Sequence, residues 1–222
     1  NAAGDAKPAK QHVSFGDDNS LTPEQLSKLL TALRLGCFEL YAPALTQAMT
    51  GLRWGEVSAL YVEDYDVEAR VLRIRRRAIL GEIVPETKTR KQRMVGVPLA
   101  LATAIREHRA WLDTEGHSGR HSALLYPSRR GTPLTHNRIS EALAAARKQT
   151  GITARFTSHG FRRSLTDLLR LAEVDPVIAA QITGHETERM RRHYSTIRAS
   201  EATSAADRTA ALFSMPAREC DL

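Results

Sequence analysis

The chain has 222 residues, 42% of them hydrophobic, and its 32 lysines and arginines against 25 acidic residues give a formal net charge of +7. This length and composition exclude an unstructured chain and a small disulfide-stapled peptide, and they suit one sizeable core or two small domains. The charge favours an anionic partner such as a nucleic acid, although a merely basic protein would carry it as well.

Residues 1–20 mix alanine, glycine, lysine, aspartate and proline without periodicity, so we expect a flexible lead-in. The first helix follows directly. Thr22 and Gln25 have the spacing of a capping box, Pro23 takes the first helical position, and Gly36 would end the helix.

Further helices are expected from apolar periodicity and from glycine and proline stops. Thr135 and Ser158 are the expected N-caps of two of them, and Asp175 and Pro176 begin another. We place these helices at residues 38–50, 54–60, 99–113, 136–150, 159–171, 176–184 and 201–213.

Between residues 71 and 97 the period changes to short β-branched runs broken by glycine and proline, which predicts a small antiparallel sheet of two or three strands. Lys88 would lie in the turn between the last two strands. The predicted fold class is therefore mostly α with a small antiparallel β-sheet, an α+β fold.

A basic arm runs through these strands, with nine lysines and arginines from Arg70 to Arg93 against Glu82 and Glu86. Such an arm can follow a phosphate backbone. The residues given this DNA-binding role are Arg75, Arg76, Arg77, Arg90, Lys91 and Arg93. Lys88, in the same arm, is either another solvated cation or a general acid that enters a groove.

With Ser158 as N-cap, His159 falls in the first helical turn and Arg162 one turn later. A helix N-terminus attracts anions, and an arginine binds two phosphate oxygens in a fork. Taken in isolation, the pair also fits an ordinary capped surface helix, which is the simpler interpretation. Arg53, with Glu56 one turn on, is either a second phosphate ligand oriented by that carboxylate or a surface charge.

Tyr194 is flanked by basic residues. A tyrosine nucleophile must lose a proton whose ordinary pKa is about 10, and nearby positive charge favours the phenolate. By default Tyr194 would be a half-buried core tyrosine and His185 a histidine at a helix end. His117 and His121 have a spacing seen in zinc sites but lack a third ligand, so we expect surface residues there and no metal.

Taken in order, these segments resemble the catalytic domain of the tyrosine recombinase, or phage integrase, family. The resemblance covers roughly residues 21–214. It rests on the segments TGLRWGE at 50–56, TKTRK at 87–91, HGFR at 159–162 and GH at 184–185, and on Tyr194, nine residues after His185. Arg163, where relatives often carry histidine, and Thr183, where leucine is usual, are minor departures.

The resemblance implies a metal-independent DNA strand transfer without a cofactor. Two arginines hold the scissile phosphate, and the tyrosine attacks it to form a 3′-phosphotyrosine link. The lysine protonates the leaving 5′ oxygen, one histidine assists proton transfer, and the other donates a hydrogen bond to the phosphate. The six catalytic residues it implies are Arg53, Lys88, His159, Arg162, His185 and Tyr194.

The resemblance makes a site-specific recombinase or integrase the expected function, acting on double-stranded DNA as a homotetramer and free in solution as a monomer. A type IB topoisomerase and a catalytically silent DNA-binding module are the alternatives. The expected catalytic domain spans residues 21–214 and a short tail spans 215–222. The stretch 201–213 would dock on a neighbouring subunit or pack on its own domain.

Cys37 and Cys220 have neither a disulfide framework nor metal-ligand spacing, which favours a reducing compartment. No stretch reaches the roughly 18 apolar residues of a membrane helix, and no leader is evident. We therefore expect a cytoplasmic, nucleoid-associated protein without membrane contact.

Overall fold

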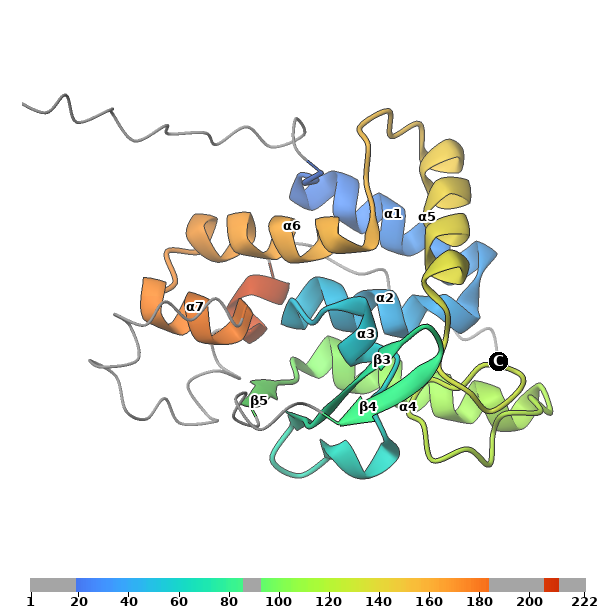
Figure 1. Ribbon diagram of the computed structural model, residues 1–222. Helices are drawn as coiled ribbons and strands as arrows, with labels where there is room; N and C mark the ends of the chain where they lie inside the picture. The colour runs from blue at the N-terminus through green and yellow to red at the C-terminus, as the bar shows by residue number, and fades with distance from the viewer. Residues whose placement is uncertain (1–18, 86–92, 184–205, 212–222) are drawn as a thin grey trace, which may run out of the picture.

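The computed structural model describes residues 19–85, 93–183 and 206–211, so the expected positions of Lys88, His185 and Tyr194 lie outside the described residues. Residues 206–210 form one short helical turn. In chain order the other elements (Figure 1) are α1 (Pro23–Gly36), α2 (Phe38–Thr50), α3 (Trp54–Val57), the 3-10 turn η1 (Val62–Asp64), β1 (Tyr65–Asp66), β2 (Val71–Ile74), β3 (Arg76–Ile79), β4 (Glu82–Pro85), β5 (Arg93–Gly96), α4 (Leu99–Thr114), α5 (His136–Thr150), α6 (Ser158–Leu171) and α7 (Pro176–Thr183). The predicted class, mostly α with little antiparallel β, is confirmed.

Helix α2 is the centre of the fold, because 11 of its 13 residues are buried. It packs against α1, α4 and α6, and Figure 1 shows α6 running alongside it. A continuous apolar core joins these helices to the small sheet, and a second cluster lies between α6 and α7. None of the described helices is long and apolar enough to cross a lipid bilayer.

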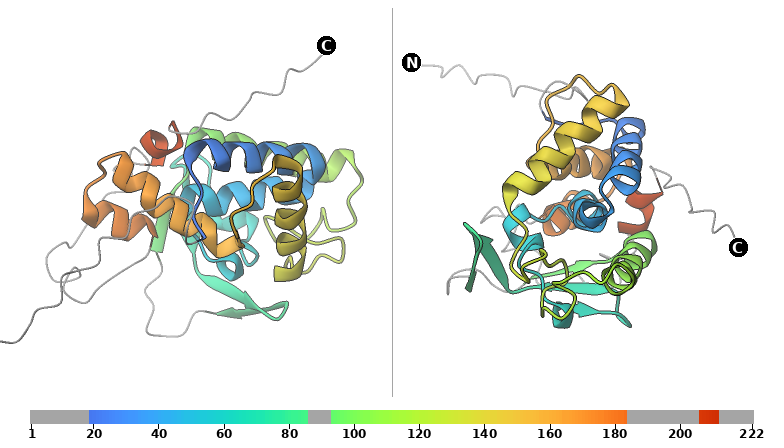
Figure 2. Two further views of the ribbon diagram at one scale, coloured as in Figure 1. Left: turned by 90° about the horizontal axis from the view of Figure 1, so that it is seen from above. Right: turned by 90° about the vertical axis from the view of Figure 1, so that its right-hand side faces the viewer.

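The strands form two separate antiparallel units rather than the one sheet expected. Strands β1, β2 and β5 make a three-stranded sheet, while β3 and β4 pair only with each other among the described strands. Leu80 and Gly81 connect β3 to β4 with positive φ angles of 51° and 88°, as a two-residue hairpin turn requires. The chain leaves the three-stranded sheet at Arg75, and β3 then packs against α3. Figure 2 shows the far end of the β3–β4 ribbon projecting from the body of the molecule.

Helix limits follow the sequence closely. The expected limits are confirmed for α1, α2 and α5, and the capping box of α1 forms between Thr22 and Gln25. Helix α3 ends at Val57 instead of residue 60, because the amides of Ala59 and Leu60 bond three residues back rather than four. Ser158 was the wrong N-cap: Thr157 has the extended backbone of an N-cap, and Ser158 is the first helical residue of α6.

His117 is a second correction, because its side chain is fully buried rather than on the surface. Its ring lies 5.7 Å from that of Trp111, and its Nε2 is 3.5 Å from Glu39 Oε1. The loop folds back because Arg109 donates hydrogen bonds to the carbonyls of residues 120 and 124. His121 is exposed, as expected.

Candidate active site

The turn after α2 places Arg53. Gly51 ends the helix in the left-handed conformation, with φ of 66°, and a Cβ there would lie 3.1 Å from Leu165 Cδ2 on α6. Arg53 then precedes α3, and its backbone N–H donates to Glu56 Oε2 at 2.8 Å. Trp54, which donates its indole N–H to the carbonyl of Leu134 at 3.2 Å, holds the turn against the loop before α5.

Glu56 connects two arginines. It is 2% exposed, and its carboxylate accepts from Arg53 Nη1 at 3.3 Å and from Arg93 Nη1 and Nη2 at 3.1 and 2.7 Å. Burial would raise the pKa of Glu56, but the hydrogen bonds and charges of Arg93 and Arg53 outweigh burial and lower that pKa below its ordinary value. Glu56 is therefore a buried anion between two cations.

Arg162 reaches the same place from helix α6. It is 3% exposed on α6, and its Nη1 donates to the carbonyl of Gly51 at 2.9 Å. Its Nη2 is buried and has no hydrogen-bond partner among the described residues. Burial, followed by the charges of Arg53 and Arg93, lowers the pKa of Arg162 to about 10, so it remains a cation at neutral pH.

Arg53, Arg93 and Arg162 form an arginine cluster around Glu56. His159 completes the described part of the site. It lies exposed in the first turn of α6. Partial desolvation, followed by the charges of Arg162, Arg163 and Arg53, lowers the pKa of His159. The ring is therefore largely neutral at pH 7 and able to take up a proton.

The structure brings together three of the six expected catalytic residues, Arg53, His159 and Arg162, and places Glu56 and Arg93 among them. The other three, Lys88, His185 and Tyr194, lie outside the described residues, as do Arg90 and Lys91 of the basic arm. Sequence reasoning anticipated that Glu56 would orient Arg53. It missed the pairing of Arg93 with Glu56, because the two residues are 37 positions apart.

The described arginines of the basic arm have different environments. Arg76 lies over the ring of Tyr61, 3.8 Å from its centroid, and pairs with Asp64 and Glu63. Arg75 is 3.6 Å from the same two carboxylates. Arg77 is exposed on β3. The charge of Arg76, like that of Arg93, is therefore largely neutralised within the fold.

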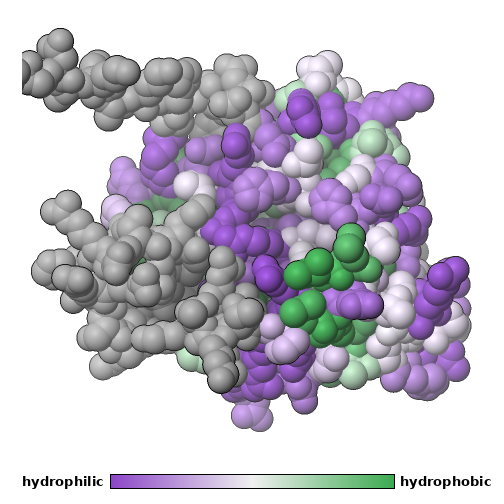
Figure 3. All heavy atoms as spheres, viewed as in Figure 1, coloured by the Kyte–Doolittle hydropathy of each residue, from purple (hydrophilic) through white to green (hydrophobic). Residues whose placement is uncertain are grey.

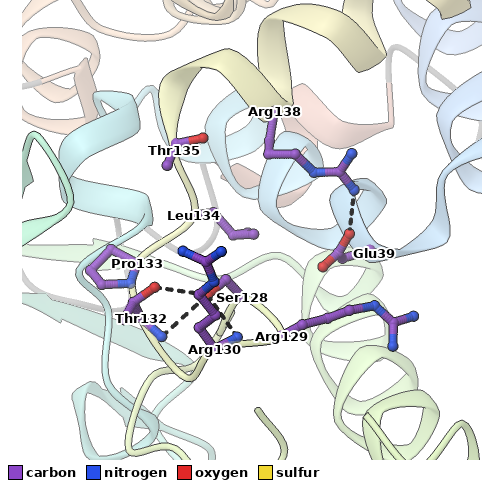
Figure 4. Close-up of a pocket in the computed structure, with 9 residues that line it drawn as sticks. All are labelled: Glu39, Ser128, Arg129, Arg130, Thr132, Pro133, Leu134, Thr135 and Arg138. Atoms are coloured by element: carbon purple, nitrogen blue, oxygen red, sulfur yellow. Dashed lines mark hydrogen bonds and ion pairs between the residues drawn. The ribbon is translucent and has the colours of Figure 1, made fainter. Parts of the chain in front are cut away.

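A groove of about 420 Å³ lies beside the start of α5, and none of its lining residues belongs to the arginine cluster. Figure 4 shows Arg138 reaching from α5 to Glu39, at 2.7 Å, and Arg129 pointing away from the other lining side chains. Near the same helix end, His136 Nε2 shares a hydrogen bond of 3.3 Å with Ser158 Oγ. The starts of α5 and α6 are thus adjacent. No group of three potential metal ligands occurs within residues 19–85, 93–183 and 206–211.

An apolar patch on the face shown in Figure 3 lies over the β3–β4 ribbon. Leu80 at the hairpin turn is fully exposed, and Ile79 is 42% exposed. One side of the ribbon is packed closely, because a Cβ on Gly55 would lie 2.6 Å from the carbonyl oxygen of Ala78.

Comparison with known proteins identifies the family. The model of the phage integrase family matches residues 19–201. The chain belongs to the phage integrase family. No curated protein matches this chain by sequence.

Solved structures of recombinases and integrases share the fold of this integrase-family chain. XerA recombinase is 21% identical, with a TM-score of 0.60, and the match covers 83% of this chain and 62% of that one. The Tn1549 transposon integrase in complex with transposon right end DNA is 18% identical, with a TM-score of 0.64 and coverage of 85% and 65%. The integrase from mycobacterium phage Brujita is 13% identical, with a TM-score of 0.62 and coverage of 96% and 63%. The chain therefore spans slightly less than two thirds of these structures.

Proposed function

We propose that this chain is the catalytic part of a site-specific DNA recombinase that cuts and rejoins strands through a covalent 3′-phosphotyrosine intermediate. One observation carries the proposal. Arg162 is only 3% exposed, yet its Nη2 has no hydrogen-bond partner among the described residues, and the charges of Arg53 and Arg93 lie close to it. Burying a cation costs free energy unless an anion pairs with it. A phosphate of the DNA backbone has the charge and the oxygens to do so.

The arginines have separate tasks in this proposal. Arg162 and Arg53 bind the non-bridging oxygens of the scissile phosphate and stabilise the charge that develops on them. Glu56 and the carbonyl of Gly51 fix these two side chains before DNA arrives, so little reorganisation is needed during the reaction. Arg93 offsets part of the Glu56 charge, which keeps the arginine cluster attractive to an anion.

The covalent step needs a nucleophile and an acid. Tyr194 is the proposed nucleophile: its oxygen bonds to phosphorus as the bond from phosphorus to the 5′ oxygen breaks. The phenol proton passes to a base, for which the neutral His159 is suited, and Lys88 protonates the leaving 5′ oxygen. His185 would donate a hydrogen bond to the phosphate. Attack by the 5′ hydroxyl of another strand reverses the step, restores the tyrosine and joins new ends.

Partners and location follow from the same proposal. The substrate is double-stranded DNA; the Tn1549 integrase structure is a complex with transposon right end DNA. Exchange of strands between two duplexes calls for four active sites in a homotetramer. Free in solution, the chain would be a monomer. If its substrate is chromosomal DNA, we expect the protein in the cytoplasm, at the nucleoid. The mechanism asks for no metal or cofactor.

Trapping on a nicked suicide duplex that carries the recognition site tests the proposal. The chain should become covalently attached to the 3′ end of the cut strand, and mass spectrometry of the peptide should place the nucleotide on Tyr194. Tyr194→Phe should abolish the adduct while DNA affinity stays the same, because the phenol oxygen bonds to DNA only in the covalent step.

Three results would contradict the assignment. An adduct that survives Tyr194→Phe would remove the nucleophile, and wild-type protein that binds DNA without forming any adduct would leave a silent DNA-binding module. Relaxation of supercoiled DNA without strand exchange between two duplexes would instead indicate a topoisomerase.

A further inference from the structure

We propose that Asn19 is a positioning residue for the catalytic helix α6, a role that rests on the proposed function. Asn19 lies before α1 and belongs to the stretch that the sequence assigned to a flexible lead-in. Its side chain binds Thr157, the N-cap of α6, twice. The Thr157 N–H donates to Asn19 Oδ1 at 2.7 Å, and Asn19 Nδ2 donates to Thr157 Oγ1 at 2.9 Å.

The two residues after Asn19 continue along the same face of α6. Ser20 Oγ donates to Asp167 Oδ2 at 2.6 Å, and the backbone N–H of Leu21 donates to Ser164 Oγ at 2.9 Å. Ser20 and Leu21 are both buried. The segment Asn19–Leu21 therefore spans α6 from its N-cap to its third turn.

This binding face lies opposite the catalytic arginine. At 3.6 residues per turn, Thr157, Gly160, Ser164 and Asp167 fall on one side of α6, and Arg162 falls on the other. Arg162 is held to α2 through the carbonyl of Gly51. Helix α6 is thus fixed between the segment Asn19–Leu21 on one side and the arginine cluster on the other.

Gly160 shows how closely the two segments approach. A Cβ at that position would lie 2.7 Å from Asn19 Oδ1 and 2.5 Å from the ring of Phe156. Such contacts are too short for any real Cβ. The glycine of the segment HGFR is therefore needed for Asn19 to reach the N-cap.

Asn19 also binds the Thr157 hydroxyl, which does not cap α6. At an N-cap, a threonine oxygen ordinarily accepts from the first amides of its own helix. Here Thr157 makes no such bond, and its hydroxyl accepts from Asn19 Nδ2 at 2.9 Å. The first-turn amide of Gly160 instead donates to the carbonyl of Thr157, at 2.8 Å, so the position of Thr157 determines where α6 begins.

The test compares Asn19→Gly with Ser20→Ala in the full chain. Glycine tolerates the φ of 60° found at residue 19 but removes both hydrogen bonds to Thr157. Single-turnover adduct formation on saturating suicide duplex should slow by about ten- to a hundredfold, while the Kd for DNA is unchanged. Asn19→Asp keeps the acceptor for the Thr157 N–H and should restore most of the rate.

Ser20→Ala is the control. It removes only the hydrogen bond to Asp167, in the third turn of α6, and should react like wild type.

A double-mutant cycle shows whether the effect passes through Thr157. Thr157→Val removes the hydroxyl, and combining it with Asn19→Gly should cost no more than the larger single effect. Additive losses, an unchanged rate in Asn19→Gly, or equal losses in Ser20→Ala would each overturn the proposed role.

An activity-independent measurement keeps this inference separate from the proposed function. Amide hydrogen exchange should rise in the first turn of α6 in Asn19→Gly and stay unchanged in α4. If wild type forms no adduct, the proposed function fails and the catalytic role of Asn19 fails with it, whatever the exchange shows. If wild type reacts and exchange in α6 does not respond to Asn19→Gly, the positioning role fails by itself.

Discussion

The two terminal nitrogens of the Arg162 guanidinium have different roles. Nη1 donates to the carbonyl of Gly51 at 2.9 Å, which fixes the plane of the group. Nη2 is buried without a partner among the described residues. A planar fork can satisfy both demands at once, whereas a lysine offers a single ammonium at the end of a flexible stem. The position thus requires geometry as well as charge.

Arg162→Lys should therefore slow adduct formation by about a hundredfold or more, because one ammonium cannot hold Gly51 and the phosphate together. DNA affinity should fall much less, since the charge is kept. Single-turnover trapping on a suicide duplex measures the rate, and Arg170→Lys, an exposed change at the other end of α6, is the control. A rate within a factor of about three of wild type would remove Arg162 from the transition state.

At the scale of elements, the sequence predicted helices better than it predicted the sheet or the site. Capping signals and glycine stops act within a few residues, which is why α1 and α2 begin and end where expected. The split between the three-stranded sheet and the β3–β4 ribbon depends on a change of direction at Arg75 that strand periodicity does not record. The pairing of Arg93 with Glu56 and the contact of Asn19 with α6 join distant segments, so no local pattern reveals them.

Helix α4 contains a buried titratable group. The ring of His108 is fully buried between Trp111 and Tyr126, with centroid distances of 5.8 and 5.2 Å. Neither of its nitrogens has a hydrogen-bond partner among the described residues. Burial, followed by the charges of Arg109 and His117, lowers the pKa of His108 to about 3, so the folded protein holds this ring neutral.

Acid should therefore destabilise the fold through His108. The unfolded chain takes up the proton below its ordinary pKa of about 6.5 and the folded chain does not, so stability present above that pH is lost as pH falls from there toward 3. The contribution of His108 to this loss is about 2 kcal/mol at pH 5. Urea unfolding of wild type and His108→Phe at pH 7.5 and pH 5 measures it as the difference between the two proteins. Equal pH dependence in both would mean that the ring is charged or solvated in the fold.

For the whole molecule, the effect of the excess positive charge on DNA binding depends on which cations the fold leaves without a carboxylate nearby. The net charge of +7 includes arginines that the fold has already paired, such as Arg76 with Asp64 and Glu63 and Arg93 with Glu56. Binding to a phosphate backbone releases counterions in proportion to the phosphates neutralised. Exposed cations should therefore determine the salt dependence, and paired ones the stability.

Arg77 and Arg76, adjacent on β3, separate these two contributions. Arg77 is exposed on the ribbon, so Arg77→Ala should weaken DNA binding and reduce the slope of log K against log salt by about one, with unfolding unchanged. Arg76→Ala should leave the slope near that of wild type but lower the midpoint of unfolding, because it removes the 2.9 Å charged hydrogen bond from Arg76 Nη1 to the buried carboxylate of Asp64. DNA titrations at several salt concentrations, together with urea unfolding of both variants, measure the two effects. Equal slopes in wild type and Arg77→Ala would place the ribbon away from the DNA and leave the arginine cluster of α3 and α6 as the contact on which binding depends.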